Sequence, residues 1–186
     1  MKWVKRIAIV LAVLLIVPTA ALLVLDHRKN AGVAQVALEI DAPPDRVWSW
    51  LDDGDKLKQW VSWMVDVKYR DPQKTNGVGA SRVLVMKDAN NGGMLMQVVS
   101  KYSEYAPPSR MTVEVSDTEG LFTGAETYLL TDLGNGRTRL EVRGHFHYSQ
   151  WFANFMEPLI TPQAEKKMAM DLGRLKRLAE AKADAR

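Results

Sequence analysis

Cysteine is absent from this chain of 186 residues. Disulfide frameworks, zinc sites built on thiolates and cysteine nucleophiles are therefore excluded. Nucleophilic triads and nucleotide-binding fingerprints are also absent, and the Gly-Val-Gly stretch at residues 77–79 opens a predicted strand, so it indicates a turn rather than a phosphate-binding loop. With 47% hydrophobic and 25% charged residues, the composition is that of a globular protein.

Most of the chain also lacks a surplus of charge of one sign. The net charge is +3, but residues 1–30 carry five basic residues against Asp26, a balance of +4 that leaves −1 for the remainder. A nearly neutral domain has no electrostatic footprint for a phosphate backbone, so we predict no nucleic-acid partner. The basic residues of the N-terminal part are Lys2, Lys5, Arg6, Arg28 and Lys29.

Residues 7–25 contain no charged side chain at all. A helix of this length spans roughly 28 Å, close to the hydrocarbon thickness of about 30 Å. Basic residues precede the segment, and Trp3 is placed where an interfacial aromatic would lie. We therefore predict that residues 1–26 form an uncleaved membrane anchor that contacts the bilayer through residues 7–25.

A cleaved signal peptide is the main alternative for this segment. Its apolar core would exceed the usual length of about 7–15 residues, and apolar chain continues beyond the best cleavage site at residues 19–21. A buried helix of the domain is disfavoured because the segment is apolar on every face. The positive-inside rule predicts a single-pass protein with its domain on the outer, periplasmic side of a bacterial inner membrane, after a linker at residues 27–33.

The remaining residues, 34–186, predict one α+β domain. Residues 34–40 alternate as a half-buried strand, and two short helices are predicted over 45–53 and 55–61, the first after a pair of prolines. About six antiparallel strands follow, with hairpin signals such as Gly-Asn-Gly at 134–136.

A long amphipathic helix closes the chain. Thr161 is its predicted cap and Pro162 its first residue, and apolar side chains recur after them at spacings of three and four. One sheet and one long helix with matching apolar faces must bury those faces against each other, so the sheet should curl around the helix.

This order of elements resembles the START-like helix-grip superfamily, which includes Bet v 1 and the polyketide cyclase/dehydrase and lipid-transport proteins. The resemblance implies a curved antiparallel sheet of about seven strands wrapped around a long C-terminal helix, with a cavity for hydrophobic ligands between them. It spans about residues 34–182, and the segments that carry it are IDAPPDRVWSWLDDGDKLKQW at 40–60, GVGASRV at 77–83, APPSRMTVEV at 106–115, LGNGRTRLEV at 133–142 and DLGRLKRLAE at 171–180.

Aromatic and methionine side chains fall on the elements expected beside that cavity. Taken singly, each could simply fill a core; taken together, they are typical of an adaptable apolar site. The predicted cavity residues are Trp48, Trp60, Trp63, Met94, Met96, Val113, Tyr128, Val142, Phe146, Trp151, Phe155, Met168 and Leu172. Phe146, Tyr148, Trp151, Phe152 and Phe155 could form either a gate over the cavity or ordinary helix-docking contacts.

Few polar residues are candidates for chemistry. Glu126 and Tyr128 share a strand face, and an inward Glu126 would be a buried acid with a raised pKa. His145 and His147 lie two apart, but their parity places them on the face opposite the apolar one. We therefore predict neither a metal site nor a cofactor.

Three functions fit this pattern. We expect a membrane-anchored, non-enzymatic protein that binds or transports a hydrophobic small molecule such as a lipid or an isoprenoid. The alternative is an enzyme of the cyclase or dehydrase type that uses the same cavity, with Glu126 and Tyr128 as candidate catalytic residues. A further alternative is a scaffold for a protein partner at the membrane.

Overall fold

The computed structural model describes residues 2–26, 32–87 and 92–181, and within these the side chains of residues 2, 4, 8, 21–26 and 151–155 are outside the description. The elements follow the predicted order of strand, two short helices, six strands and a long helix, after an N-terminal helix. Their bounds are α1 Lys2–Asp26, β1 Val33–Ile40, α2 Pro44–Asp52, α3 Gly54–Trp60, β2 Met64–Tyr69, β3 Ser81–Lys87, β4 Leu95–Ala106, β5 Arg110–Asp117, β6 Phe122–Gly134, β7 Arg137–Tyr148 and α4 Trp151–Glu180.

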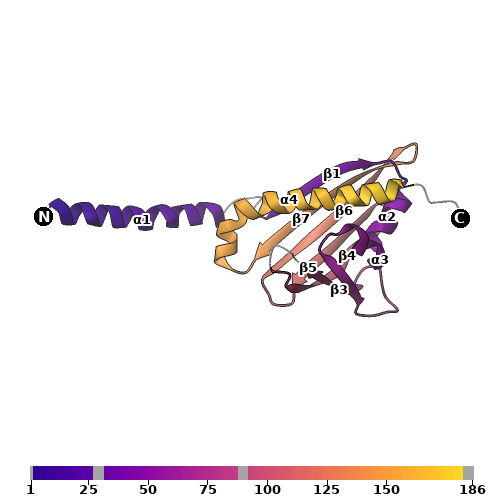
Figure 1. Cartoon of the computed structure of the whole chain (residues 1–186), viewed down its shortest axis with the longest axis horizontal. Helices are drawn as coiled ribbons and strands as arrows, with labels where there is room; N and C mark the ends of the chain where they lie inside the picture. The colour runs from indigo at the N-terminus through magenta and orange to yellow at the C-terminus, as the bar shows by residue number, and fades with distance from the viewer. Residues whose placement is uncertain (1, 27–31, 88–91, 182–186) are drawn as a thin grey trace.

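All seven strands form one antiparallel sheet in the order β1-β7-β6-β5-β4-β3-β2. Helix α4 runs across one face of this curved sheet, with α2 beside the end of α4 (Figure 1), and α3 packs against β2 and α4. The predicted α+β class, with a seven-stranded curved antiparallel sheet around a C-terminal helix, is confirmed.

Alternating side chains build the core between sheet and helix. In β7 the even-numbered residues from Thr138 to Gly144 are buried while Arg139, Arg143 and His145 are exposed. The register places Val142 opposite Val36 of β1 and Leu140 opposite Leu38. Since successive side chains of a strand point to opposite faces, one residue of slip would expose this whole apolar set.

Helices α2 and α3 are positioned by their first residues. Pro44 begins α2, where its missing N–H costs no hydrogen bond and its fixed φ suits a helix. At the start of α3 the Asp53 carboxylate accepts hydrogen bonds from the backbone N–H groups of Asp55 at 2.8 Å and Lys56 at 3.2 Å. These two short helices cover the sheet beside α4 and bring Leu57 and Trp60 into the core.

Two local predictions were wrong. Helix α4 begins at Trp151, ten residues before the predicted cap, and contains Pro158 and Pro162. These prolines remove backbone donors without ending the helix, which bends along its first part (Figure 1). Thr161 donates to the Glu157 carboxylate at 2.5 Å rather than capping a helix. In β2, the alternation of residues 63–69 predicts that Val65 shares a face with Trp63 and Val67, but a register shift between Met64 and Asp66 leaves Val65 exposed.

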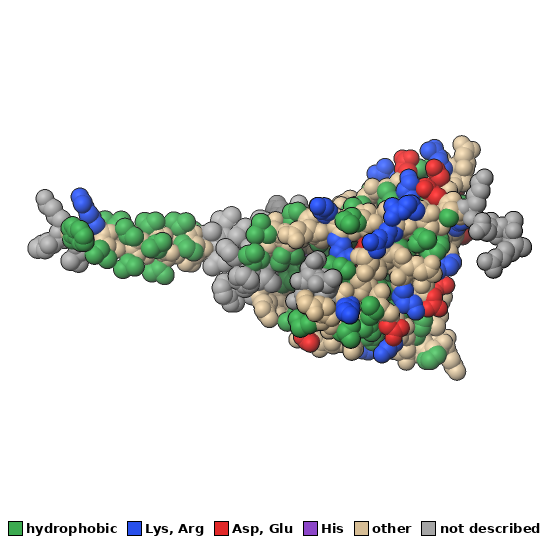
Figure 2. All heavy atoms as spheres, viewed as in Figure 1, with side chains coloured by type: hydrophobic (Ala, Val, Ile, Leu, Met, Phe, Trp, Pro, Cys, Tyr) green, Lys and Arg blue, Asp and Glu red, His purple; other side chains and the backbone are tan. Residues whose placement is uncertain are grey.

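Helix α1 extends away from the domain (Figure 1), and its described apolar side chains are exposed (Figure 2). Even so, among the side chains described, no helix is both long and apolar enough to cross a membrane. The predicted transmembrane span over residues 7–25 is therefore not supported, and its periplasmic orientation stays a prediction. Part of the predicted linker, residues 27–31, lies outside the described residues.

Replacing Leu175 by alanine should test how far the fold depends on the contact between α4 and the sheet. Leu175 is fully buried, so the lost side chain leaves a cavity, and we expect the free energy of unfolding to fall by about 2–5 kcal/mol in urea titrations. The matched change Met170→Ala removes an exposed side chain of the same helix and should cost less than about 0.5 kcal/mol. Equal losses would contradict this account.

Candidate functional site

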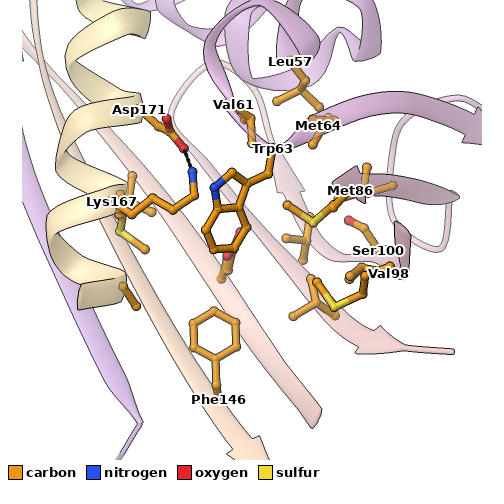
Figure 3. Close-up of a pocket in the computed structure, with 18 of the residues that line it drawn as sticks. Leu57, Val61, Trp63, Met64, Met86, Val98, Ser100, Phe146, Lys167 and Asp171 are labelled. Atoms are coloured by element: carbon orange, nitrogen blue, oxygen red, sulfur yellow. Dashed lines mark hydrogen bonds and ion pairs between the residues drawn. The ribbon is translucent and has the colours of Figure 1, made fainter. Parts of the chain in front are cut away.

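A cavity of about 330 Å³ lies between the inner face of the sheet and α4. Helix α3 and the segment that follows it, residues 61–63, complete its wall. This volume falls in the range of roughly 300–1,000 Å³ that is typical of small-molecule sites. Figure 3 shows side chains from Leu57 to Asp171 converging on it from these elements. Most of the lining side chains are apolar, with a few polar groups among them.

Strand alternation supplies the curved wall of this cavity. Every second residue of a strand points inward, so β3 contributes Arg82, Leu84 and Met86, and each of the strands β4 to β7 contributes its own inward set. Gly144 on β7 lies directly opposite Glu126 of β6. A Cβ atom at Gly144 would come within 2.6 Å of the Phe146 ring, so the glycine lets that ring lie over the strand.

Nine of the predicted cavity residues line this space, from both sides of it: Trp60, Trp63, Met96, Val113, Tyr128, Val142, Phe146, Met168 and Leu172. Two others do not. Trp48 is buried on α2 against the Tyr105 ring, with centroids 5.4 Å apart, and Met94 is 63% exposed just before β4. The side chains of Trp151 and Phe155 lie outside the described residues, as does that of Phe152.

The Glu126 and Tyr128 side chains line the cavity together. The Tyr128 hydroxyl donates a hydrogen bond to Glu126 Oε2 at 2.8 Å. Burial raises the pKa of Glu126, against the opposing effects of the Tyr128 hydrogen bond and the Arg82 charge. Burial and the neighbouring Glu126 carboxyl also raise the pKa of the Tyr128 hydroxyl. The pair is therefore a buried acid beside a protonated phenol.

Arg82 is a second polar group of the cavity, and it was not among the predicted site residues. Its side chain is only 4% exposed, and its Nη1 donates to the backbone carbonyl of Asp52 at 3.0 Å. The guanidinium lies over the Tyr102 ring, 5.2 Å from the centroid. Within the described part of the chain, its buried Nε has no hydrogen-bond acceptor.

Asp52, at the end of α2, joins that helix to β4 next to Arg82. Its carboxylate accepts hydrogen bonds from the hydroxyls of Tyr102 at 2.8 Å and Tyr105 at 2.7 Å. Burial and the bond to Asp52 raise the pKa of Tyr105 to about 12, and burial raises that of Tyr102 further. Both tyrosines therefore keep their protons and hold the end of α2 against β4.

Opposite this end, α4 is joined to the segment that follows α3. The Lys167 ammonium lies 4.1 Å from the centroid of the Trp63 ring, 2.8 Å from Asp171 Oδ2 and within hydrogen-bond distance of the Ser62 hydroxyl (Figure 3). Asp171 Oδ1 also accepts from the Ser62 backbone N–H at 3.3 Å. These contacts hold Trp63 over the cavity.

The paired histidines and Phe146, which the sequence also singles out, lie on opposite faces of β7. His145 and His147 are exposed on the outer face of β7, with ring centroids 4.5 Å apart, and the described residues contain no cluster of three or more potential metal ligands. Phe146 meets Phe122 edge to face at a centroid distance of 6.3 Å, at the cavity wall.

Replacing Glu126 by glutamine should change how stability depends on pH. Because burial raises its pKa above the ordinary 4.5, the folded chain keeps this proton to higher pH than the unfolded chain does. The resulting stabilisation is complete below about pH 4.5 and is lost as the pH rises through the folded-state pKa. We therefore expect Glu126→Gln to gain stability relative to the parent protein between pH 5 and pH 8 in urea unfolding. Glu114→Gln, on the exposed face of β5, should show no such gain, and equal behaviour of both variants would contradict the assignment.

Known structures share this architecture. A protein from Chromobacterium violaceum is 18% identical, with a TM-score of 0.64 over 80% of this chain and 97% of its own. A conserved protein from Geobacillus kaustophilus is 11% identical, with a TM-score of 0.66 over 79% and 94%. A protein from Thermus thermophilus is 17% identical, with a TM-score of 0.65 over 82% and 99%. At these identities the likeness concerns the fold alone.

No curated protein matches the sequence. A family model does: the model described as polyketide cyclase / dehydrase and lipid transport matches residues 32–180, most of the chain. This match agrees with the seven-stranded sheet, the C-terminal helix and the cavity between them, and it confirms the resemblance found in the sequence. The chain belongs to the polyketide cyclase/dehydrase and lipid-transport family.

Proposed function

We propose that this protein binds and carries a hydrophobic small molecule, such as a lipid or an isoprenoid, in the cavity between sheet and α4. The observation that carries the proposal is the cavity itself, about 330 Å³ in volume and lined mainly by apolar side chains. Burying an apolar ligand there gains roughly 25 cal/mol for each Å² removed from water. Lining methionines such as Met86, Met96 and Met168 can adapt to chains of different shape.

The cavity differs in exposure along its length. At its closed end Arg82, Ser100 and Tyr102 are all buried. Towards the ends of β3 and β7, Met86 and Phe146 are only partly buried. We propose that the cavity opens on this side, from which α1 extends (Figure 1).

Exposed apolar side chains gather on that same side. Leu95 begins β4, Leu121 precedes β6 and Leu159 lies in the first part of α4, and all three are exposed. Helix α1 adds a continuous apolar surface (Figure 2). Contiguous exposed apolar patches mark interaction sites. We propose that a lipid surface covers this patch and that the ligand exchanges there between the bilayer and the cavity.

Ligand recovery is the direct test of binding. We expect native mass spectrometry of the purified full-length chain to show a bound apolar molecule, which organic extraction then releases. Ala164→Trp should reduce the bound fraction at least several-fold, because Ala164 lines the cavity. Ala169→Trp adds the same ring on the exposed side of the helix and should leave the bound fraction unchanged. An empty parent protein, or equal loss in both variants, would overturn the proposal.

The Glu126–Tyr128 pair favours a second candidate, an enzyme of the cyclase or dehydrase type. A buried acid hydrogen-bonded to a phenol could donate a proton to a ligand oxygen. The same recovery experiment separates the two functions. A carrier returns the supplied ligand unchanged, whereas an enzyme returns a product, and Glu126→Gln would then leave the ligand unconverted.

Attachment to lipid is tested by vesicle flotation of the full-length chain. We expect the protein to float with vesicles of phosphatidylcholine and phosphatidylglycerol. Replacing Leu14 and Leu15, both exposed on α1, by glutamate should reduce the floated fraction at least tenfold because it places charge in the apolar surface. The control with glutamates at Gln73 and Thr75, exposed in the β2–β3 loop, has the same net charge. Flotation that the α1 changes leave intact would contradict the proposed attachment.

A further inference from the structure

Arg82 is a buried cation that uses little of its hydrogen-bonding capacity. A guanidinium has five N–H donors, and the bond from Nη1 to the Asp52 carbonyl is the one hydrogen bond that this side chain makes within the described part of the chain. Its contact with the Tyr102 ring stabilises the charge in part but accepts none of the N–H donors in a conventional hydrogen bond. Arg82 nevertheless lines the cavity with 4% of its surface exposed.

The charge of Arg82 also lacks an ion-pair partner among the described residues, although it acts on Glu126 and opposes the rise in the pKa of that group. None of the ion pairs among the described residues includes it. The carboxyl groups of Asp52 and Glu126 are hydrogen-bonded to tyrosine hydroxyls instead, which orient these carboxyl groups without neutralising them. An unpaired charge in an apolar interior is costly, so a site of this kind is completed by an anion.

Ser100 lies where it can contribute to holding that anion. It is the cross-strand partner of Arg82 in the β3–β4 ladder, it lines the same closed end of the cavity, and it is 1% exposed. A serine hydroxyl donates one hydrogen bond, and a guanidinium donates two parallel bonds to a carboxylate. From this end, the apolar lining residues Leu84 and Met86 continue along β3 towards the proposed opening.

We propose that the ligand is an acidic amphiphile of the long-chain carboxylic acid class, with its carboxylate on Arg82 and Ser100 and its apolar chain directed to the open end. This inference rests on the proposed function and narrows its ligand. Burial raises the pKa of Glu126, and a protonated Glu126 carboxyl beside the bound carboxylate would add no repulsion.

A competition between two probes that differ only in the head group tests the inference. The full-length chain is incubated at pH 8 with equal concentrations of oleic acid and oleyl alcohol, and native mass spectrometry measures the ratio of the two complexes. Charge-assisted hydrogen bonds at a buried site correspond to a preference of roughly 10- to 100-fold for the acid. Arg82→Met should abolish this preference while the alcohol still binds.

Control variants separate the head-group contact from other effects. Arg143→Met removes an equal charge from the exposed face of β7 and should leave the preference intact. Arg82→Lys, which keeps the charge but not the paired donors, should retain only part of the preference, and it serves if the methionine variant does not fold. Glu126→Gln tests whether the Glu126 carboxyl, rather than a ligand, neutralises Arg82.

The outcomes distinguish the two levels of the proposal. Equal binding of acid and alcohol by the parent protein, or a preference that survives Arg82→Met, would overturn the acidic ligand while leaving the apolar carrier standing. A preference that arises only in Glu126→Gln would show that Glu126 itself neutralises Arg82, which also overturns it. Binding of neither probe would overturn the proposed function together with this inference.

Discussion

The packing of α4 against the inner face of the sheet is the contact on which the rest of the structure depends. In its C-terminal half, the residues that face the sheet are buried: Leu172, Leu175 and Ala179 each expose at most 1% of their surface. Its middle part, which includes Ala164 and Met168, instead lines the cavity. Protein interiors are close-packed, so a space of this size persists only where the surrounding elements are held apart.

Polar contacts at both ends of the cavity hold those elements in place. At the closed end Asp52 joins α2 to Tyr102 and Tyr105 of β4. On the other side Asp171 and Lys167 join α4 to the segment that carries Trp63. In both places a carboxylate accepts hydrogen bonds from hydroxyl or ammonium donors, so these contacts hold the walls of the cavity without leaving the carboxylates unpaired. Arg82 departs from this pattern, because its buried Nε has no acceptor within the described part of the chain, and it also lines the cavity.

The fold was predictable from the sequence because its elements repeat simple periods. The alternation in β7 and the apolar stripe of α4 indicate which faces turn inward, and the inner face of the strands carries Met96 and Phe146 at the cavity. Trp48 was misplaced because a helical face shows which side of α2 is buried but not against which neighbour, and its neighbour is Tyr105.

The polar part of the candidate site was harder to predict. Arg82 lies in a strand whose other members are mostly apolar, and the signal that could have revealed it is its shared parity with Leu84 and Met86. No sequence period shows that Arg82 and Asp52, thirty residues apart, meet at one end of a cavity. Likewise, Lys167 and Trp63 are brought together by the packing of α4, which depends on the whole sheet.

The side on which the cavity is proposed to open is also the side from which α1 extends. Arg82 and Ser100 are buried at one end, and the exposed apolar surfaces of α1 and Leu159 lie on the side of the proposed opening. In a bilayer the head group of an amphiphile is at the surface and its chain is inside. A protein resting on that surface meets the head first, and the chain follows it out of the lipid. The proposed orientation, with the carboxylate at Arg82 and the chain at the open end, is the one that this order of events produces, so the ligand need not turn around between bilayer and cavity.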